Sequence, residues 1–239
     1  TTTASFSVDF LVGAEEGKGI TSATQTDGDE AVEFNYSFQI DLNTSFTGED
    51  SLDISIDAGD LGNTDAASAA SPNNEFDPNN TGDLLTVDGI AYTFPVGDEL
   101  TVFVGTDSDG SALFTTACVY GTPSDTLDDC GNVNAGITGG GVAAGASYDV
   151  GNGFSAAFGI QATESGILTD ETMDDAYAFN AAYIADNYGV SITYANVEDG
   201  TATGNNDDTF TALNGYIAFD GYPTLSAGVE YGNDDGSTN

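Results

Sequence analysis

The segment VEFNYSFQIDL (32–42) alternates strictly between apolar and polar residues along its whole length. Side chains point to opposite faces at successive positions of a β-strand, so this segment predicts one strand with an apolar face and a polar face. A helix repeats every 3.6 residues and does not produce such an alternation. Its apolar positions are Val32, Phe34, Tyr36, Phe38, Ile40 and Leu42.

Segments of the same kind recur along the 239 residues, and stretches of sustained helical periodicity do not. The segment near 209–220 is the least regular, because Phe210 and Ile217 lie in opposite phases. The chain therefore predicts an all-β protein. The expected strands are 3–12, 31–47, 51–59, 85–95, 99–105, 141–150, 153–163, 175–186, 188–197, 209–220 and 223–232.

The connections between these strands are alternately short and long. An up-and-down outer-membrane barrel has short turns at one rim and long loops at the other. A β-sandwich with Greek-key crossings has no reason to keep that order. We therefore predict an antiparallel up-and-down transmembrane β-barrel. The short links lie at 48–50, 96–98, 151–152, 186–187 and 221–222, and the long ones at 13–30, 60–84, 106–140, 164–174 and 198–208.

Aromatic residues gather near the predicted strand ends. Amphipathic rings prefer the interface between membrane and water, so two girdles of this kind border the apolar band of a barrel. The other explanation is that tyrosine simply favours strands. The residues are Tyr92, Phe94, Tyr148, Tyr177, Tyr183, Tyr188, Tyr194, Tyr222 and Tyr231.

The chain carries 40 acidic residues and a single basic one, Lys18, for a net charge of −39. Binding of nucleic acid is excluded, because it needs Lys or Arg to replace phosphate counterions. Without histidine, Ser–His–Asp and Cys–His catalysis and the usual zinc sites are excluded too, and we expect neither an enzyme nor a cofactor. Acidic loop tips could hold Ca²⁺ or Mg²⁺ loosely, or could simply be solvated. They are 27–30, 128–129, 207–208 and 234–235.

Two cysteines, Cys118 and Cys130, lie twelve positions apart in the longest predicted loop. In an oxidising compartment they would form a disulfide, and otherwise they would be two unlinked thiols. The loop itself, 106–140, has two possible placements. It either folds inward and narrows a pore or remains an ordinary external loop.

The polar face of the predicted barrel would face a water-filled lumen, and the apolar face would contact lipid. A lumen of carboxylates and amides without basic residues favours cations. The predicted pore-lining residues are Glu33, Asn35, Gln39, Asp41, Asp53, Asp57, Ser147, Asp149, Gln161, Asn180 and Glu230.

Eleven strands are recognisable, or about 12 if another is hidden in 60–84 or 106–140, and the odd count of eleven departs from the even numbers typical of single-chain bacterial barrels. An open sheet edge cannot face lipid, because its amides would lack partners. We therefore expect residues 1–239 to form one β-barrel domain that lacks its last strands.

The stretches AVEFNYSFQIDLNTSFTGED (31–50) and IAYTFPVGDELTVFVG (90–105) resemble the cyanobacterial outer-membrane porins of the S-layer-homology and carbohydrate-selective type. YGVSITY (188–194) and PTLSAGVEYGN (223–233) are similar to them as well. The resemblance implies a homotrimer in the outer membrane, with barrels of about sixteen strands that pass ions and small solutes. The chain departs from the family in lacking the N-terminal cell-wall-binding domain, the last strands and nearly all basic residues.

Two functional hypotheses follow. The first is a porin for passive and mildly cation-selective diffusion of inorganic ions and small hydrophilic solutes. The alternative is an extracellular β-sandwich, a surface-layer or filament and adhesion subunit, that binds calcium through its acidic loops. The sandwich would bury Phe34, Phe38, Ile54 and Phe158 against a second sheet.

Overall fold

A computed structural model describes residues 2–13, 33–60, 81–119, 130, 132–138, 141–162, 175–199 and 206–233. Within them, eleven strands form one sheet in which every strand pairs with its sequence neighbours. None of the described residues forms a helix that is long and apolar enough to cross a membrane. The strands are β1 (Thr3–Gly13), β2 (Glu33–Thr44), β3 (Ser51–Gly59), β4 (Thr86–Val96), β5 (Leu100–Thr106), β6 (Val142–Gly151), β7 (Phe154–Ala162), β8 (Asp175–Ile184), β9 (Tyr188–Asp199), β10 (Asn206–Ile217) and β11 (Leu225–Asn233).

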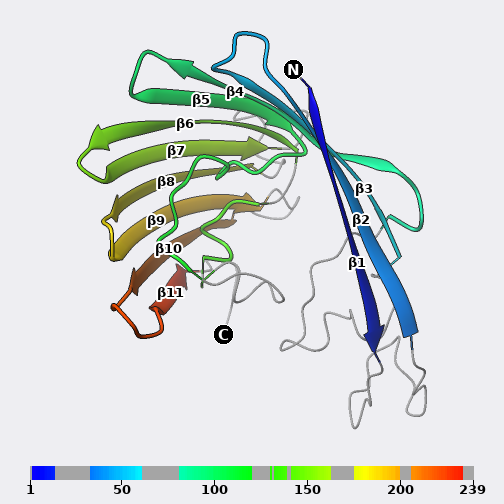
Figure 1. Cartoon of the computed structure of the whole chain (residues 1–239). Coiled ribbons are helices and arrows are strands. Elements are labelled where there is room, and N and C mark those ends of the chain that lie inside the picture. The colour runs from blue at the N-terminus through cyan, green and yellow to red at the C-terminus, as the bar shows by residue number, and fades with distance from the viewer. Residues whose placement is uncertain are drawn as a thin grey trace.

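All eleven predicted strands are present, and neighbouring strands pair antiparallel throughout the described sheet. The predicted all-β, up-and-down class is therefore confirmed. Figure 1 shows the sheet as a curved arc, with β1 and β11 apart at its two edges. Among the described residues β1 pairs only with β2, and β11 only with β10, so the described part of the sheet is an open arc.

The pairing registers give the sheet two continuous faces. On one face Asp41 lies opposite Ser5 of β1 and Ser55 of β3. Far along the same face, Asn180 lies opposite Ala157 of β7 and Thr193 of β9. Register shifts occur after Ser55 in β3 and after Asp149 in β6, and beyond the first of them Asp57 still lies opposite Thr86.

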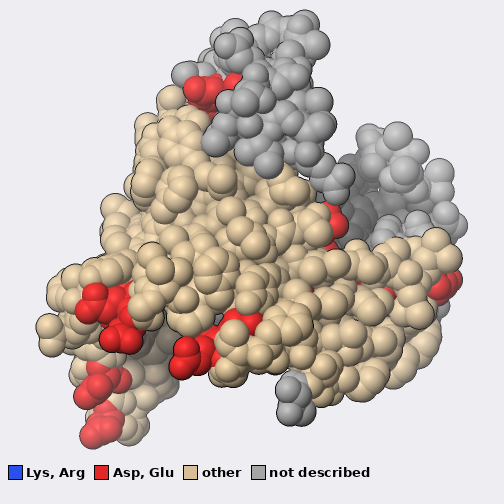
Figure 2. All heavy atoms as spheres, turned by 90° about the horizontal axis from the view of Figure 1, so that it is seen from above, with Lys and Arg blue, Asp and Glu red and all other residues tan. Residues whose placement is uncertain are grey.

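The other face is apolar, and many of its large side chains are exposed, whereas Phe38 of β2 and Ile54 of β3 are half-buried. Phe34 in β2 is 63% exposed, Phe158 in β7 is 38% exposed and Val229 in β11 is 62% exposed. The described residues form a single sheet, so no second sheet packs on these side chains. Figure 2 shows a broad face on which acidic residues form only small groups, mostly toward its margins. Soluble monomers rarely expose so large an apolar surface, and this observation disagrees with the sandwich alternative.

Aromatic rings of this apolar face contact one another near the two ends of the strands. At the end that carries the short turns, the ring centroids of Phe154 and Tyr183 are 4.4 Å apart, and those of Tyr183 and Tyr188 are 5.7 Å apart. At the opposite end the centroids of Phe10 and Phe34 are 5.6 Å apart. Phe158 and Phe179, whose ring centroids are 4.9 Å apart, lie in the middle of β7 and β8, so aromatic contacts occur at both ends of the strands and also between them.

Asp50 fixes the short turn between β2 and β3. Its carboxylate accepts hydrogen bonds from the Ser45 hydroxyl (2.7 Å), the Thr47 amide (2.7 Å) and hydroxyl (2.6 Å), and the Tyr92 hydroxyl (2.6 Å). These donors, the Thr47 and Tyr92 hydroxyls first, hold the pKa of Asp50 far below its usual range. The turn is thereby tied to β4 beside it.

Candidate functional site

The registers bring the predicted pore-lining residues to one face of the sheet. Glu33 and Asn35 occupy β2 positions of the same parity as Asp41, but their side chains lie outside the described residues. The face divides into two parts. One part, on β1 to β4, is acidic, and the other, on β7 to β11, is covered by the segment that connects β5 to β6.

Three carboxylates of β2 and β3, those of Asp41, Asp53 and Asp57, form what we call the acidic wall. Asp41 accepts hydrogen bonds from Gln39 Nε2 (2.7 Å) and Ser55 Oγ (2.9 Å). The other bonds of the wall come from Asn43 Nδ2 (2.6 Å) and Ser51 Oγ (2.7 Å) to Asp53, and from Thr86 Oγ1 (2.7 Å) to Asp57. Asp41 and Asp53 are half-buried, whereas Asp57 is buried, which the expectation of a lumen-facing side chain did not include.

Neutral groups donate these hydrogen bonds to the acidic wall. Amide and hydroxyl donors orient a carboxylate without cancelling its charge. The described residues include no lysine or arginine that could do so, because the only basic residue of the chain, Lys18, lies outside them. Within the described residues, therefore, no ion pair neutralises the acidic wall.

The segment after β5 lies inside the curve of the sheet, across β8 to β11 (Figure 1). We call residues 107–119 its forward arm and residues 130–138 its return arm, of which Gly131 is not described. Backbone amides of the forward arm donate to side chains of the sheet. These bonds run from Gly110 to Gln161 Oε1 (2.9 Å), from Thr115 to Asn180 Oδ1 (3.0 Å) and from Ala117 to Ser191 Oγ (2.8 Å).

The return arm is held by the last two strands. Asn214 Nδ2 of β10 donates to the carbonyl oxygen of Cys130 at 2.6 Å. The Glu230 carboxylate of β11 accepts the backbone amides of Asn134 (3.0 Å) and Ala135 (2.9 Å). A disulfide between Cys118 and Cys130, whose Cα atoms are 6.0 Å apart, joins the two arms.

A small apolar core lies between the arms and the sheet. Ala135 and Ile137 of the return arm pack on small residues of the sheet, and Phe114 and Phe210 pack against the edge of this cluster. The sheet residues of the core are Ala176, Ala178, Ala195 and Ala212. Such small side chains let the backbone of the arms approach the sheet closely.

Three of the predicted pore-lining residues bind the two arms. Gln161 is 6% exposed and Asn180 is 4% exposed, so both amides lie beneath the forward arm instead of facing open lumen. The Glu230 carboxylate likewise accepts hydrogen bonds from the return arm. The physical reason is that the arms are irregular, and their backbone amides need acceptors that the sheet must supply.

Two sequence signals pointed to this cover, although the alternation analysis left the placement of 106–140 open. Phe210 lies on the polar face, where a solvated lumen would have a polar side chain, and it packs instead against the core under the arms. The polar face of β7 to β10 is also rich in Ala and Gly. Of the two placements considered, the described parts of the loop have the inward one.

The remaining predicted positions lie away from the cover. Ser147 is half-buried, and Asp149 is exposed near the short turn, where it accepts the amide of Gly151 (2.8 Å). No group of three or more potential metal-ligating side chains occurs within the described residues. Of the acidic loop tips, only 207–208 is described, at the start of β10, and the others lie outside the described residues.

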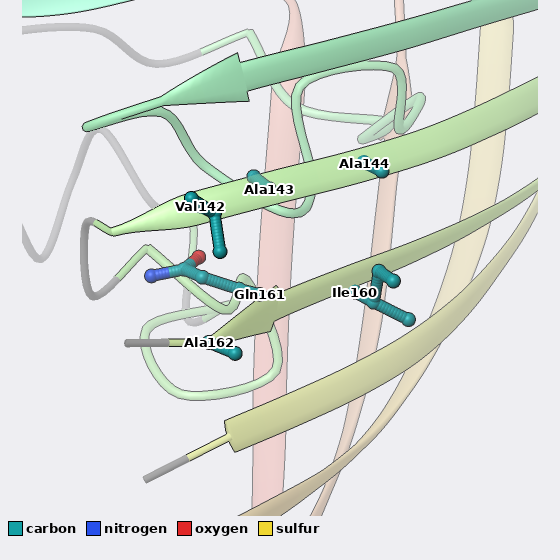
Figure 3. Close-up of a pocket in the computed structure, with 6 residues that line it drawn as sticks. All are labelled: Val142, Ala143, Ala144, Ile160, Gln161 and Ala162. Atoms are coloured by element: carbon teal, nitrogen blue, oxygen red, sulfur yellow. The ribbon is translucent and has the colours of Figure 1, made fainter. Parts of the chain in front are cut away.

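Figure 3 shows a small hollow between β6 and β7, with a volume of about 70 Å³. Five of its six lining residues are apolar, and the sixth, Gln161, already binds the amide of Gly110. The hollow therefore offers no group with which to recognise a ligand. Its lining residues are Val142, Ala143, Ala144, Ile160, Gln161 and Ala162.

No family model and no curated protein matches the chain. Among solved structures it is similar to OmpF of Salmonella typhi, determined in complex with daunomycin. The two share 10% sequence identity at a TM-score of 0.39, over 98% of this chain and 78% of the OmpF chain. A likeness this remote assigns no function, so the geometry of the chain itself has to carry the assignment.

Proposed function

We propose that this protein is an outer-membrane channel of the porin type, through which small hydrophilic solutes and inorganic ions diffuse passively with a preference for cations. One observation supports this most strongly. A single sheet exposes large apolar side chains on strands from one edge to the other, while the opposite, concave face carries the acidic wall on β2 and β3 and holds an inward segment. Lipid outside and water inside is the environment in which such a sheet is stable.

The apolar face has dimensions that suit a membrane. On β2 it runs from Phe34 to Leu42, eight residue steps or about 27 Å along the strand, and a tilt of about 40° shortens this to a height of about 20 Å. Transmembrane barrels have an apolar band about 25 Å tall, and the bacterial outer membrane is thinner than average. Aromatic contacts at both ends of the strands match the positions of the two interfaces.

The proposed mechanism of selection is steric and electrostatic. The two arms would narrow the lumen from the side of β7 to β11, and the acidic wall would supply the field on the opposite side. Asp107 and Asp109 of the forward arm are exposed and add negative charge. A permeating cation would meet carboxylates on both sides, and an anion would meet no compensating lysine or arginine among the residues that the structure describes.

Further parts of the proposal extend beyond the described residues. The free edges of β1 and β11 need partners in lipid, because unpaired amides are costly there, and a closed barrel of about sixteen strands would provide them. A homotrimer in the outer membrane, and loosely bound Ca²⁺ or Mg²⁺ at acidic loops, also stay predictions.

The test is electrical. Protein purified in detergent is added to a planar bilayer, and the reversal potential is measured in a KCl gradient, with the heat-denatured preparation as control. We expect stepwise conductance and a reversal potential of cation-selective sign. A protein that is soluble without detergent and adds no conductance contradicts the channel, whereas an anion-selective sign contradicts only the selectivity.

A further inference from the structure

We propose that Glu230 is a positioning residue for the channel, which fixes the return arm and so sets the width of the lumen. This inference rests on the proposed channel function. By sequence alone, Glu230 is one more acidic residue of the polar face. By its contacts it differs from the acidic wall, because its partners belong to the inward segment and not to neighbouring strands.

The geometry around Glu230 is a clamp. One carboxylate oxygen, Oε2, accepts the backbone amides of Asn134 (3.0 Å) and Ala135 (2.9 Å). The other, Oε1, accepts the side-chain amide of Asn134 at 2.7 Å. Hydrogen bonds to a charged acceptor are about twice as strong as those between neutral groups.

The return arm needs this acceptor. It makes a compact turn, in which the amide of Gly136 donates to Asn132 O (3.1 Å) and that of Ile137 donates to Asn134 O (3.3 Å). The amides of Asn134 and Ala135 come too early in the turn to find such a carbonyl within it. Without Glu230 these donors would have to reach water, and the turn would have to lift from the sheet.

Lifting the turn would open the apolar core. Ala135 is fully buried and packs in one cluster with Ala212, the residue directly opposite Glu230 in the sheet. The clamp therefore holds Ala135 against the strand beside it. Its loss would move the arm toward the lumen or loosen it, and either change alters the free width of the channel.

If Glu230 only supplied charge to the pore, its variants would behave differently from variants of a residue that holds the return arm. Asp53 provides the matched control for the effect of charge alone. Asp53→Asn removes one negative charge from the acidic wall, whose partners are Asn43 and Ser51 of the same sheet. Glu230→Gln removes the same charge but also replaces an acceptor oxygen by an NH₂ group that faces two N–H donors. Glu230→Ala removes the clamp entirely.

The experiment compares the full chain with Glu230→Gln, Glu230→Ala and Asp53→Asn in planar bilayers. It measures current noise, the size of the neutral polyethylene glycols that still enter the pore, and the reversal potential. We expect both Glu230 variants to change the glycol size limit and raise the noise, and Asp53→Asn to shift only the reversal potential. Glu230 variants that behave like Asp53→Asn overturn the inference.

A second readout does not depend on conduction. Hydrogen exchange of the Asn134 and Ala135 amides is measured in detergent, with heat modifiability on gels as evidence that each variant is folded. We expect exchange about tenfold faster or more in Glu230→Ala than in Asp53→Asn, since the amides lose a charged acceptor. If the Asn134 and Ala135 amides exchange faster in Glu230→Ala but the protein does not conduct, Glu230 holds the return arm and the channel function is wrong. If their exchange is unchanged, Glu230 does not hold the return arm.

Discussion

Replacement of Gly159 by alanine tests whether the forward arm truly rests on the sheet. Gly159 lies on the polar face of β7, beneath Gly110 of the arm. A Cβ atom at Gly159 would lie 1.8 Å from the carbonyl oxygen of Gly110, and Cβ contacts under 3.0 Å essentially never occur. Backbone has no flexible end that could turn aside, so the arm has to rise by more than about 1 Å.

The energetic cost follows from the bonds that this movement breaks. The amide of Gly110 donates to Gln161 Oε1 at 2.9 Å and to Ile137 O at 3.2 Å, and a rise of that size takes both beyond hydrogen-bond distance. Each bond contributes about 0.5–1.5 kcal/mol, and overpacking costs about 1–3 kcal/mol. We expect Gly159→Ala to destabilise the docked arm by about 2–6 kcal/mol.

The assay is hydrogen exchange of the Gly110 amide in detergent, together with thermal unfolding. Gly215→Ala is the matched control, because Gly215 lies on the apolar face of β10 and its nearest neighbour, Gly189 O, would be 3.3 Å from the new Cβ. We expect fast exchange at Gly110 in Gly159→Ala and near-normal exchange in Gly215→Ala. Equal exchange and equal stability in the two variants would refute the docked position of the arm.

Three further predictions concern the two faces and one rim of the sheet. Neutralising Asp41 and Asp53 together should lower the cation-to-anion permeability ratio in a KCl gradient, because a unit charge 4 Å from a permeating ion contributes about 1 kcal/mol in water. The effect should be clearest at low salt, since salt screens the charge. An unchanged ratio would mean that ions do not pass near these two residues. Ile192→Arg puts a charge on the exposed apolar face in the middle of β9, so folding into liposomes should weaken by about 2–4 kcal/mol, and unimpaired folding would argue against contact with lipid. Hydrogen bonding lowers the pKa of Asp50 in the folded protein. Asp50 therefore stabilises the turn between β2 and β3 fully above the usual pKa range of aspartate, and this stabilisation is lost only as the pH falls through the much lower pKa of the folded state. The Thr47 amide should thus stay protected at pH 4 in the wild type and lose protection at every pH in Asp50→Asn, as followed by hydrogen exchange.

The strands could be predicted because each one separates two environments. A residue pair such as Phe38 and Gln39 then differs in polarity at every step, and the period of two appears directly in the sequence. The segment 51–59 was predicted with the bounds that the structure has, Ser51–Gly59. Directions followed as well, because alternating short and long connections leave little freedom other than an up-and-down order.

The inward segment could not be predicted in the same way, because no periodic pattern encodes its contacts. Its amides bind side chains 51 to 74 positions away, those of Gln161, Asn180 and Ser191. Alternation assigns a side chain to a face but does not say what covers that face. For this reason alternation places Gln161 and Asn180 on the polar face, but it contains no information about the forward arm that buries them there.

The distribution of charge on the polar face follows from the same cover. Burying a carboxylate beneath the arms would cost far more than burying an amide or a hydroxyl with one good hydrogen bond. Accordingly Asn180 and Thr193 lie under the arms, while Asp41 and Asp53 lie on the part of the face that the described arms leave open. Glu230 is acidic beneath the return arm because three N–H donors meet its carboxylate there. If the sheet closes round a lumen, the field inside is one-sided, and cations should pass nearer to β2 and β3 than to the arms.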